Sequence, residues 1–268
     1  MRTFVINLVK ESQKKALFLE SWKDLLNDVE ILEAVDGRAL SLEELKHQVK
    51  DYPAPGLTPG EIGCALSHLN VYRKIVAKKI SYALVLEDDA RPTNLYSREI
   101  LQSIETKIKA NGFGQRFVIF LQESEHIDIS HEPRLFEIES CPFVSVQKMW
   151  SSHAYIISYE AAEALCRFLP PIRYEADYWE GLCLGAHLQM AASLLPLIVT
   201  NDPDKANSSL EQNRTKIRDL RNTMRTKQAF DELGIRNPHL RIKLFPLNRF
   251  IKKHYQLIRQ KQLLKAMK

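Results

Sequence analysis

The segment 81–90, SYALVLEDDA, places three consecutive carboxylates directly after an apolar run. The run is rich in Tyr, Val and Leu and is typical of a buried strand. Three acids at the end of a buried strand repel one another, and hard divalent cations, which prefer oxygen ligands shared with phosphates, would compensate them. Side chains two residues apart on an extended chain point the same way. We therefore predict a metal site formed by Glu87 and Asp89.

The same acids have a second interpretation that needs no metal. Asp88 or Asp89 can cap a helix or face solvent in a turn. A short motif is a hypothesis in itself. Pro92 follows closely, and the sequence leaves both interpretations open.

Length and composition fit one large α/β domain, or one domain with an appendage. The 268 residues are 45% hydrophobic and 26% charged, as in ordinary globular proteins. No run of 18 apolar residues predicts a membrane span, and residues 1–8 have the pattern of a strand rather than of a secretion signal, so we expect a cytoplasmic location. The cysteines lack paired spacing, so we expect free thiols, with Cys64 and Cys183 in the core.

Charge is distributed unevenly along the chain. Ten of the 38 Lys and Arg residues lie in 236–268, which contain no acid, whereas residues 1–235 hold 28 bases against 33 acids. Apolar residues are interspersed with the bases of this tail, and such a segment can lie on an anionic membrane surface. We expect peripheral contact with the inner face of a membrane; the alternative is a tail packed on the body. No nucleic-acid motif accompanies the charge, so nucleic acid is not an expected partner.

Alternating strand and helix patterns predict an α/β fold with a mostly parallel central sheet. The expected strands are 2–8, 29–35, 81–87, 116–121, 154–158 and 194–199, and the expected helices are 12–26, 41–49, 58–79, 97–110, 158–169 and 177–192. Thr58, Pro59 and Glu61 mark one helix start as a capping box with proline at the first position. Residues 122–142 are expected to be an irregular excursion.

Polar residues follow three of the predicted strands. Ligands of open α/β sheets bind outside the carboxyl ends of the strands, so we expect these residues to converge on one crevice. The three strand ends are Asn7-Leu8, Asp36-Gly37 and Glu87-Asp88-Asp89.

Four segments in this order resemble glycosyltransferase family 25. They are NL at 7–8, DG at 36–37, TPGEIGCALSH at 58–68 and LEDDA at 86–90, and the resemblance runs from residue 3 to about residue 200. Their order, their spacing and the long GEIGCALSH match make the resemblance specific, which a lone EDD would not be. The family contains bacterial lipopolysaccharide and lipooligosaccharide galactosyltransferases and animal collagen galactosyltransferases.

The resemblance implies a GT-A-like catalytic domain, to which we assign residues 1–200. From composition we expect a polar linker and a basic helical extension over 201–268. The resemblance also implies a UDP-galactose donor, inversion at the anomeric carbon, and Mn²⁺ (or Mg²⁺) bound through Glu87, Asp89 and the donor diphosphate. The predicted donor-binding residues are Asn7, Leu8, Asp36, Gly37, Ser67, His68 and Asp88. The alternative for His68 is a packing histidine with a satisfied ring nitrogen.

An inverting transfer needs a base for the acceptor hydroxyl, and carboxylates suit this role. Residues 173–180, RYEADYWE, offer three of them among aromatic rings. By resemblance we favour Asp177, with Glu175 and Glu180 as alternatives, although the family often shows Pro-Val-Asp where this chain has Glu-Ala-Asp. Asp177 could equally cap the following helix. His153 departs from the family's small-residue turn and either lines the acceptor pocket or packs.

The sequence therefore predicts a metal-dependent galactosyltransferase that acts on a lipid-linked oligosaccharide, the core of a lipooligosaccharide. One alternative is transfer of glucose from UDP-glucose. A second is a non-catalytic nucleotide-sugar or carbohydrate-binding protein whose acids are structural. A third is a surface-binding module that works through the basic tail 236–268.

Overall fold

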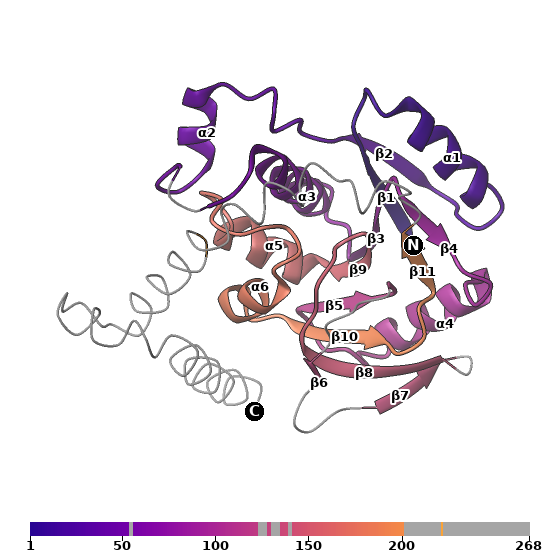
Figure 1. Cartoon of the computed structure of the whole chain (residues 1–268). Helices are drawn as coiled ribbons and strands as arrows, with labels where there is room; N and C mark the ends of the chain where they lie inside the picture. The colour runs from indigo at the N-terminus through magenta and orange to yellow at the C-terminus, as the bar shows by residue number, and fades with distance from the viewer. Residues whose placement is uncertain (54–55, 123–127, 130–134, 139–140, 201–220, 222–268) are drawn as a thin grey trace, which may run out of the picture.

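Figure 1 shows the protein as a computed structural model, which describes residues 1–53, 56–122, 128–129, 135–138, 141–200 and 221. The strands are β1 (Arg2–Asn7), β2 (Val29–Glu33), β3 (Tyr82–Glu87), β4 (Ala90–Pro92), β5 (Phe117–Phe120), β6 (Asp128–Ile129), β7 (Leu135–Ile138), β8 (Cys141–Lys148), β9 (Ala154–Ser158), β10 (Gln189–Ser193) and β11 (Ile198–Thr200). The helices are α1 (Ser12–Trp22), α2 (Leu42–Gln48), α3 (Pro59–Ala77), α4 (Arg98–Lys109), α5 (Tyr159–Phe168) and α6 (Trp179–Ala186). The predicted linker and basic tail lie outside the described residues, Arg221 excepted.

A nine-stranded sheet organises the described part of the chain, with the order β2-β1-β3-β9-β5-β10-β8-β6 and β7 paired to β8. Strands β2, β1, β3, β5 and β10 run the same way, whereas β9 and β8 run antiparallel to their neighbours. The predicted α/β class and the shared direction of the main strands are confirmed. The sheet is nevertheless mixed, because β9 lies antiparallel between β3 and β5.

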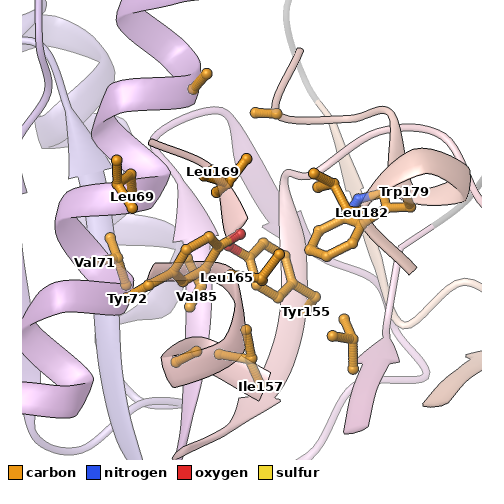
Figure 2. Packing of buried hydrophobic residues seen from close by; sticks show 14 of the residues in the cluster. Leu69, Val71, Tyr72, Val85, Tyr155, Ile157, Leu165, Leu169, Trp179 and Leu182 are labelled. Atoms are coloured by element: carbon orange, nitrogen blue, oxygen red, sulfur yellow. The ribbon is translucent and has the colours of Figure 1, made fainter. Parts of the chain in front are cut away.

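Helices cover both faces of this sheet (Figure 1). Because side chains of a strand alternate between faces, Phe4 and Val85 pack with α3, α5 and α6 in one core. Val5 and Leu84 belong to the other core, which includes residues of α1 and α4. Figure 2 shows Tyr72, Tyr155 and other members of the first core.

Sequence signals located the helix starts correctly. Thr58 and Glu61 form the predicted capping box of α3, and the Ser158 side chain accepts from the Ala161 N–H at the start of α5. No helix in the described ranges combines the length and apolarity needed to cross a bilayer.

Three predictions about the second half of the chain were wrong. Residues 122–142 contain β6, β7 and the start of β8 rather than only irregular chain. The helix predicted over 177–192 ends at Ala186, because His187 adopts a left-handed conformation (φ 55°), and the following residues form β10. The strand predicted over 194–199 starts later, as β11, and pairs with β4 outside the main sheet.

Candidate functional site

The carboxyl ends of β1 and β3 lie side by side, since Ile6 pairs with Glu87 in the parallel register. One residue further on, Asn7 Nδ2 donates a 2.6 Å hydrogen bond to Asp88 Oδ2. Asn7 is buried and Asp88 half-buried. The polar residues of these two strand ends therefore meet at one edge of the sheet.

The three carboxylates 87–89 have different environments. Strand β3 ends at Glu87, and the chain turns at Asp88 and Asp89 before β4. Arg91 holds this turn by donating to the carbonyl oxygens of Asp88 and Ala90, at 2.9 and 2.8 Å. The extended geometry assumed for Glu87 and Asp89 is therefore wrong, because the chain leaves the strand between them.

Burial dominates the ionisation of Asp88. It raises the pKa of this carboxyl above its usual value, while the hydrogen bond from Asn7 and the charge of Lys14 oppose the shift. Holding a carboxylate at a partly desolvated position costs free energy unless positive charge lies nearby. The end of β3 is therefore a place where a bound cation would be favourable.

Glu87 faces the buried helix α3. Its Oε1 lies 3.2 Å from Nε2 of His68, and its backbone N–H donates to the His153 carbonyl oxygen at 2.9 Å. Burial would raise the pKa of Glu87, but the hydrogen bond with His68 and the positive charges near it together outweigh burial, so the pKa is lowered. Glu87 therefore stays ionised and orients His68.

His68 is the centre of a buried hydrogen-bond chain. Its Nδ1 lies 2.7 Å from the Tyr155 hydroxyl, which lies 2.9 Å from the Tyr72 hydroxyl (Figure 2 shows both tyrosines). An ionised carboxylate can only accept a hydrogen bond, so Nε2 of His68 must carry the proton in its bond with Glu87. In the neutral imidazole, Nδ1 then accepts from Tyr155. Burial raises the pKa of both tyrosines, which therefore stay neutral donors.

Two glycines bring α3 against the loop after β2. A Cβ atom on Gly63 would lie 2.4 Å from the Val35 carbonyl oxygen, and one on Gly37 would lie 1.7 Å from the Pro59 carbonyl oxygen. Ser67 Oγ accepts from the Val35 N–H at 2.8 Å and donates to the Gly63 carbonyl oxygen at 2.7 Å. Ser67 thus fixes the loop to the helix, and its hydroxyl is committed to the backbone.

Asp36 lies at the rim of the same edge. Its carboxylate accepts from the Lys10 ammonium at 2.5 Å and from the Arg38 N–H at 3.2 Å. The hydrogen bond from Lys10 is the main cause that lowers the pKa of Asp36. Leu8 is half-buried and Gly37 buried nearby in the sequence. Asp36 therefore offers an ionised carboxylate that is partly open to solvent.

The residues before β9 extend the edge on its other side. The Gln122 side chain, at the end of β5, accepts from the Ala154 N–H at 2.6 Å and donates to the Ser151 carbonyl oxygen at 2.5 Å. Ser151 Oγ lies 2.7 Å from His153 Nδ1, and His153 is buried. His153 therefore packs in this turn.

The loop that carries the predicted base is attached to this turn. Ser152 Oγ donates to the Ala176 carbonyl oxygen at 2.9 Å, and Trp179 Nε1 lies 3.0 Å from the Ser151 carbonyl oxygen. Asp177, half-buried, precedes the N-cap residue Tyr178, whose side chain makes no cap hydrogen bond. Asp177 is therefore not the N-cap residue of α6.

The three candidate carboxylates of this loop differ in their partners. Glu175 is buried and pairs with Arg221 at 2.9 Å, so its carboxylate is already engaged by a cation. Glu180 is half-buried in the first turn of α6. The pairing of Glu175 makes it the weakest of the three candidates for a base.

The acidic strand end has the oxygen donors that a hard divalent cation prefers. Only one oxygen of Glu87, Oε1, contacts His68. A second group lies alongside: the ligand atoms of Cys64, His68 and Glu87 lie within 4.8 Å of one another. Sulfur and imidazole ligands suit softer metals than manganese. The i,i+4 spacing of Cys64 and His68 on one helix was the overlooked signal for this second group.

Sequence reasoning missed Gln122, Tyr72, Tyr155 and Arg221. A Tyr in a strand or helix normally indicates core packing, and nothing local distinguishes these two. Gln122 carried one weak signal, since it is a polar residue directly after an apolar strand-like run.

Comparison with known proteins gives one family match over most of the chain. The profile described as "Glycosyltransferase family 25 (LPS biosynthesis protein)" matches residues 1–179. Mouse procollagen galactosyltransferase 2 is 26% identical over 242 residues, which cover 79% of this chain and 38% of that protein. Mouse inactive glycosyltransferase 25 family member 3 is 34% identical over 110 residues, which cover 38% of this chain and 19% of that protein. The UTP-bound UGPase from Acinetobacter baumannii aligns with a TM-score of 0.39 and 11% identity over 92% of this chain and 98% of that chain.

Open α/β sheets commonly bind ligands outside the carboxyl ends of their strands, and this mixed sheet has polar and acidic residues there. The family match covers more than half of the sequence, and the chain belongs to glycosyltransferase family 25. It spans about two fifths of the length of the mouse galactosyltransferase, at 38%. The named relatives include both galactosyltransferases and a protein called inactive.

Proposed function

We propose that this protein transfers galactose from UDP-galactose, with inversion, to a hydroxyl of a lipid-linked oligosaccharide such as a lipooligosaccharide core. Family membership and relatives named galactosyltransferases support the reaction class. The observation that carries the proposal is the 2.6 Å contact of Asn7 with Asp88, which joins two polar strand ends into one ligand edge. Residues 236–268 would contact the anionic membrane surface that carries the acceptor.

On the donor side, Asn7, Leu8, Asp36 and Gly37 would contact the uridine and ribose. Asp36 is half-buried and ionised, so its carboxylate can accept hydrogen bonds from ribose hydroxyls. His68 is buried and hydrogen-bonded through both ring nitrogens, and Ser67 bonds to backbone groups. We assign both residues the role of fixing Glu87 and the loop after β2, rather than direct contact with phosphate.

In the metal-bound enzyme, Glu87 and Asp89 would hold Mn²⁺, or Mg²⁺, which offsets the negative charge of the UDP leaving group. Asp88, bonded to Asn7, supports the same position. The alternative group of Cys64, His68 and Glu87 shares one ligand with this pair, so the two sites compete for Glu87.

On the acceptor side, Asp177 would act as the base. The acceptor hydroxyl gives its proton to the Asp177 carboxylate as its oxygen attacks the anomeric carbon, and UDP leaves on the opposite face. Tyr178 and Trp150, whose ring centroids lie 5.8 Å apart, flank this loop and offer apolar surface to a sugar ring.

The test is UDP release by the purified protein with a panel of UDP-sugars and an oligosaccharide acceptor, with manganese or with a chelator. We expect release from UDP-galactose that requires manganese. Asp177→Asn should lower kcat by about 100- to 10,000-fold, the usual contribution of a base. Asp89→Asn should raise the manganese concentration required for activity.

Asp24→Asn is the matched control, since Asp24 is an exposed aspartate on the same chain. It should leave activity unchanged. An unchanged manganese requirement of Asp89→Asn would contradict the assignment of Asp89 as a metal ligand. Release of UDP from UDP-glucose alone would mean that the donor is UDP-glucose rather than UDP-galactose. Binding of UDP without turnover of any donor would favour a non-catalytic protein, in line with the relative named inactive.

A further inference from the structure

Arg221 lies beyond the residues matched by the family profile, yet it contacts the predicted catalytic region. Its guanidinium donates to both carboxylate oxygens of Glu61, at 2.9 and 2.7 Å, and pairs with Glu175 Oε1 at 2.9 Å. It also donates to the Gly56 carbonyl oxygen through two nitrogens, at 3.1 and 3.0 Å. One side chain therefore joins two separate segments of the domain, the stretch 56–61 and the loop at Glu175.

This cluster is almost completely withdrawn from water. The exposed fractions of the side chains are 2% for Glu61, 5% for Glu175 and 12% for Arg221. A buried carboxylate without a cationic partner is strongly unfavourable, and here two carboxylates share one planar guanidinium. Gly56 has a φ of +66°, and a Cβ atom on it would lie 2.9 Å from the Arg221 backbone nitrogen. The chain is thus shaped to receive Arg221 closely.

The two carboxylates belong to the two halves of the predicted site. Glu61 is the third residue of α3 and completes its capping box, so it is fixed to the helix that carries His68. Glu175 begins the turn that carries Asp177, because its carbonyl oxygen accepts from the Tyr178 N–H at 3.3 Å.

At least two contacts join this turn to other segments. One is the hydrogen bond from Ser152 to the Ala176 carbonyl oxygen at 2.9 Å. Another is the ion pair of Arg221 with Glu175. Loss of the ion pair would remove the Arg221 cation from a buried carboxylate two residues before Asp177, which favours a shift of the turn towards water.

We propose that Arg221 is a positioning residue for sugar transfer: it holds the turn 175–178, and with it Asp177, against helix α3. This inference rests on the proposed function, in which Asp177 is the base. Arg221 acts through Glu175 and has no direct contact with the reacting atoms. We therefore expect that Arg221, although it lies beyond the residues matched by the family profile, is required for efficient transfer.

The test compares Arg221→Gln, Arg221→Lys and Glu175→Gln with the control Arg167→Gln, which removes the largely exposed ion pair of Arg167 with Glu163. Galactose transfer and hydrolysis of UDP-galactose are measured separately, together with the KM for donor. A displaced base slows transfer by about 10- to 100-fold. It leaves hydrolysis and the donor KM unchanged. Arg221→Lys should retain part of the transfer rate, because lysine keeps the positive charge. The rate should stay below that of wild type, because lysine lacks the planar guanidinium that can donate to several acceptors at once.

Hydrogen exchange of the Tyr178 amide gives a readout that does not depend on turnover. It should become faster in Arg221→Gln and Glu175→Gln and stay unchanged in Arg167→Gln. In the double variant this exchange should be no faster than in Arg221→Gln, which already lacks the ion pair with Glu175.

Each outcome decides the inference. Active wild-type protein together with unchanged transfer in Arg221→Gln would overturn it, and so would equal losses of transfer, hydrolysis and donor affinity. No turnover by the wild-type protein would overturn the proposed function instead, and the exchange rate of Tyr178 would then decide by itself whether Arg221 holds the turn.

Discussion

Asn7 and Asp88 are 81 residues apart in sequence, and Nδ2 of the first donates a 2.6 Å hydrogen bond to Oδ2 of the second. Asn7 ends β1, and Asp88 follows the last residue of β3. Parallel pairing of the two strands puts both side chains at one edge. The contact also supplies a donor to a carboxylate whose pKa burial raises.

Substitutions of Asn7 test this contact. Asn7→Ala should lower the free energy of unfolding by about 1–3 kcal/mol, since a partly buried carboxylate loses its donor. Asn7→Asp should be worse at pH 8, because two carboxylates would then lie within hydrogen-bond distance. Protonation of one of them relieves the repulsion, so Asn7→Asp should approach Asn7→Ala as the pH falls to 5. Urea unfolding at both pH values measures this, and equal stability of the two variants at pH 8 would contradict it.

The buried chain from Tyr72 through Tyr155 to His68 predicts unequal effects of two similar substitutions. Tyr155→Phe removes the central hydroxyl and leaves two buried groups, Tyr72 Oη and His68 Nδ1, without their partner. It should cost about 2–3 kcal/mol, whereas Tyr72→Phe should cost about 1 kcal/mol. After Tyr155→Phe, the further change Tyr72→Phe should cost nothing. Urea unfolding of both single variants and the double variant checks this coupling.

The substitution Gly63→Ala should change stability in the direction opposite to the one that helix propensity predicts. Alanine in place of a helical glycine normally stabilises by about 1 kcal/mol. Here its Cβ atom would meet the Val35 carbonyl oxygen at 2.4 Å, and backbone cannot move aside cheaply. We expect Gly63→Ala to destabilise by about 3 kcal/mol.

The control for Gly63 is Gly181→Ala in α6. Its Cβ atom would meet only the ring of Tyr178, at 2.5 Å, and a side chain can rotate away. Thermal unfolding should therefore show a clearly smaller loss for Gly181→Ala. A stabilised Gly63→Ala protein would mean that α3 does not lie against the loop after β2.

Features with local causes could be predicted from the sequence. The start of α3 depends on Thr58, Pro59 and Glu61, which are neighbours in the chain, and the structure has this capping box. The meeting of strand ends followed from a general rule of parallel sheets. The arrangement of Glu87 and Asp89 could not be predicted, because the turn between them is held by Arg91.

Features that depend on distant partners were missed. The sequence QMAAS of β10 has no strand pattern, and it forms a strand because β5 and β8 pair with it on both sides. The helix before it ends at Ala186, because the next residue, His187, is left-handed although it is not a glycine. Arg221 finds its carboxylate partners 160 and 46 positions away, which no periodicity reveals.

The ion pairs of Glu30 predict how the free energy of unfolding depends on pH. Its carboxylate accepts from Lys74, Arg2 and Lys78, of which the Lys74 hydrogen bond contributes most, and its pKa is lowered from 4.5 to about 2. Because the folded-state pKa lies below the unfolded one, the stabilisation is complete above pH 4.5 or so and is lost as the pH falls towards 2. Solvent screening limits it to about 1–2 kcal/mol.

The substitution Glu30→Gln therefore destabilises at pH 7, and the difference from wild type should shrink steadily between pH 4.5 and pH 2. It should also shrink in 1 M NaCl, where exposed charges are screened. Glu33→Gln, at an exposed glutamate on the same strand, is the control and should show neither dependence. Urea unfolding across this pH range measures both variants. A difference for Glu30→Gln that is constant from pH 7 to pH 2 would mean that the three cations do not stabilise the ionised carboxylate.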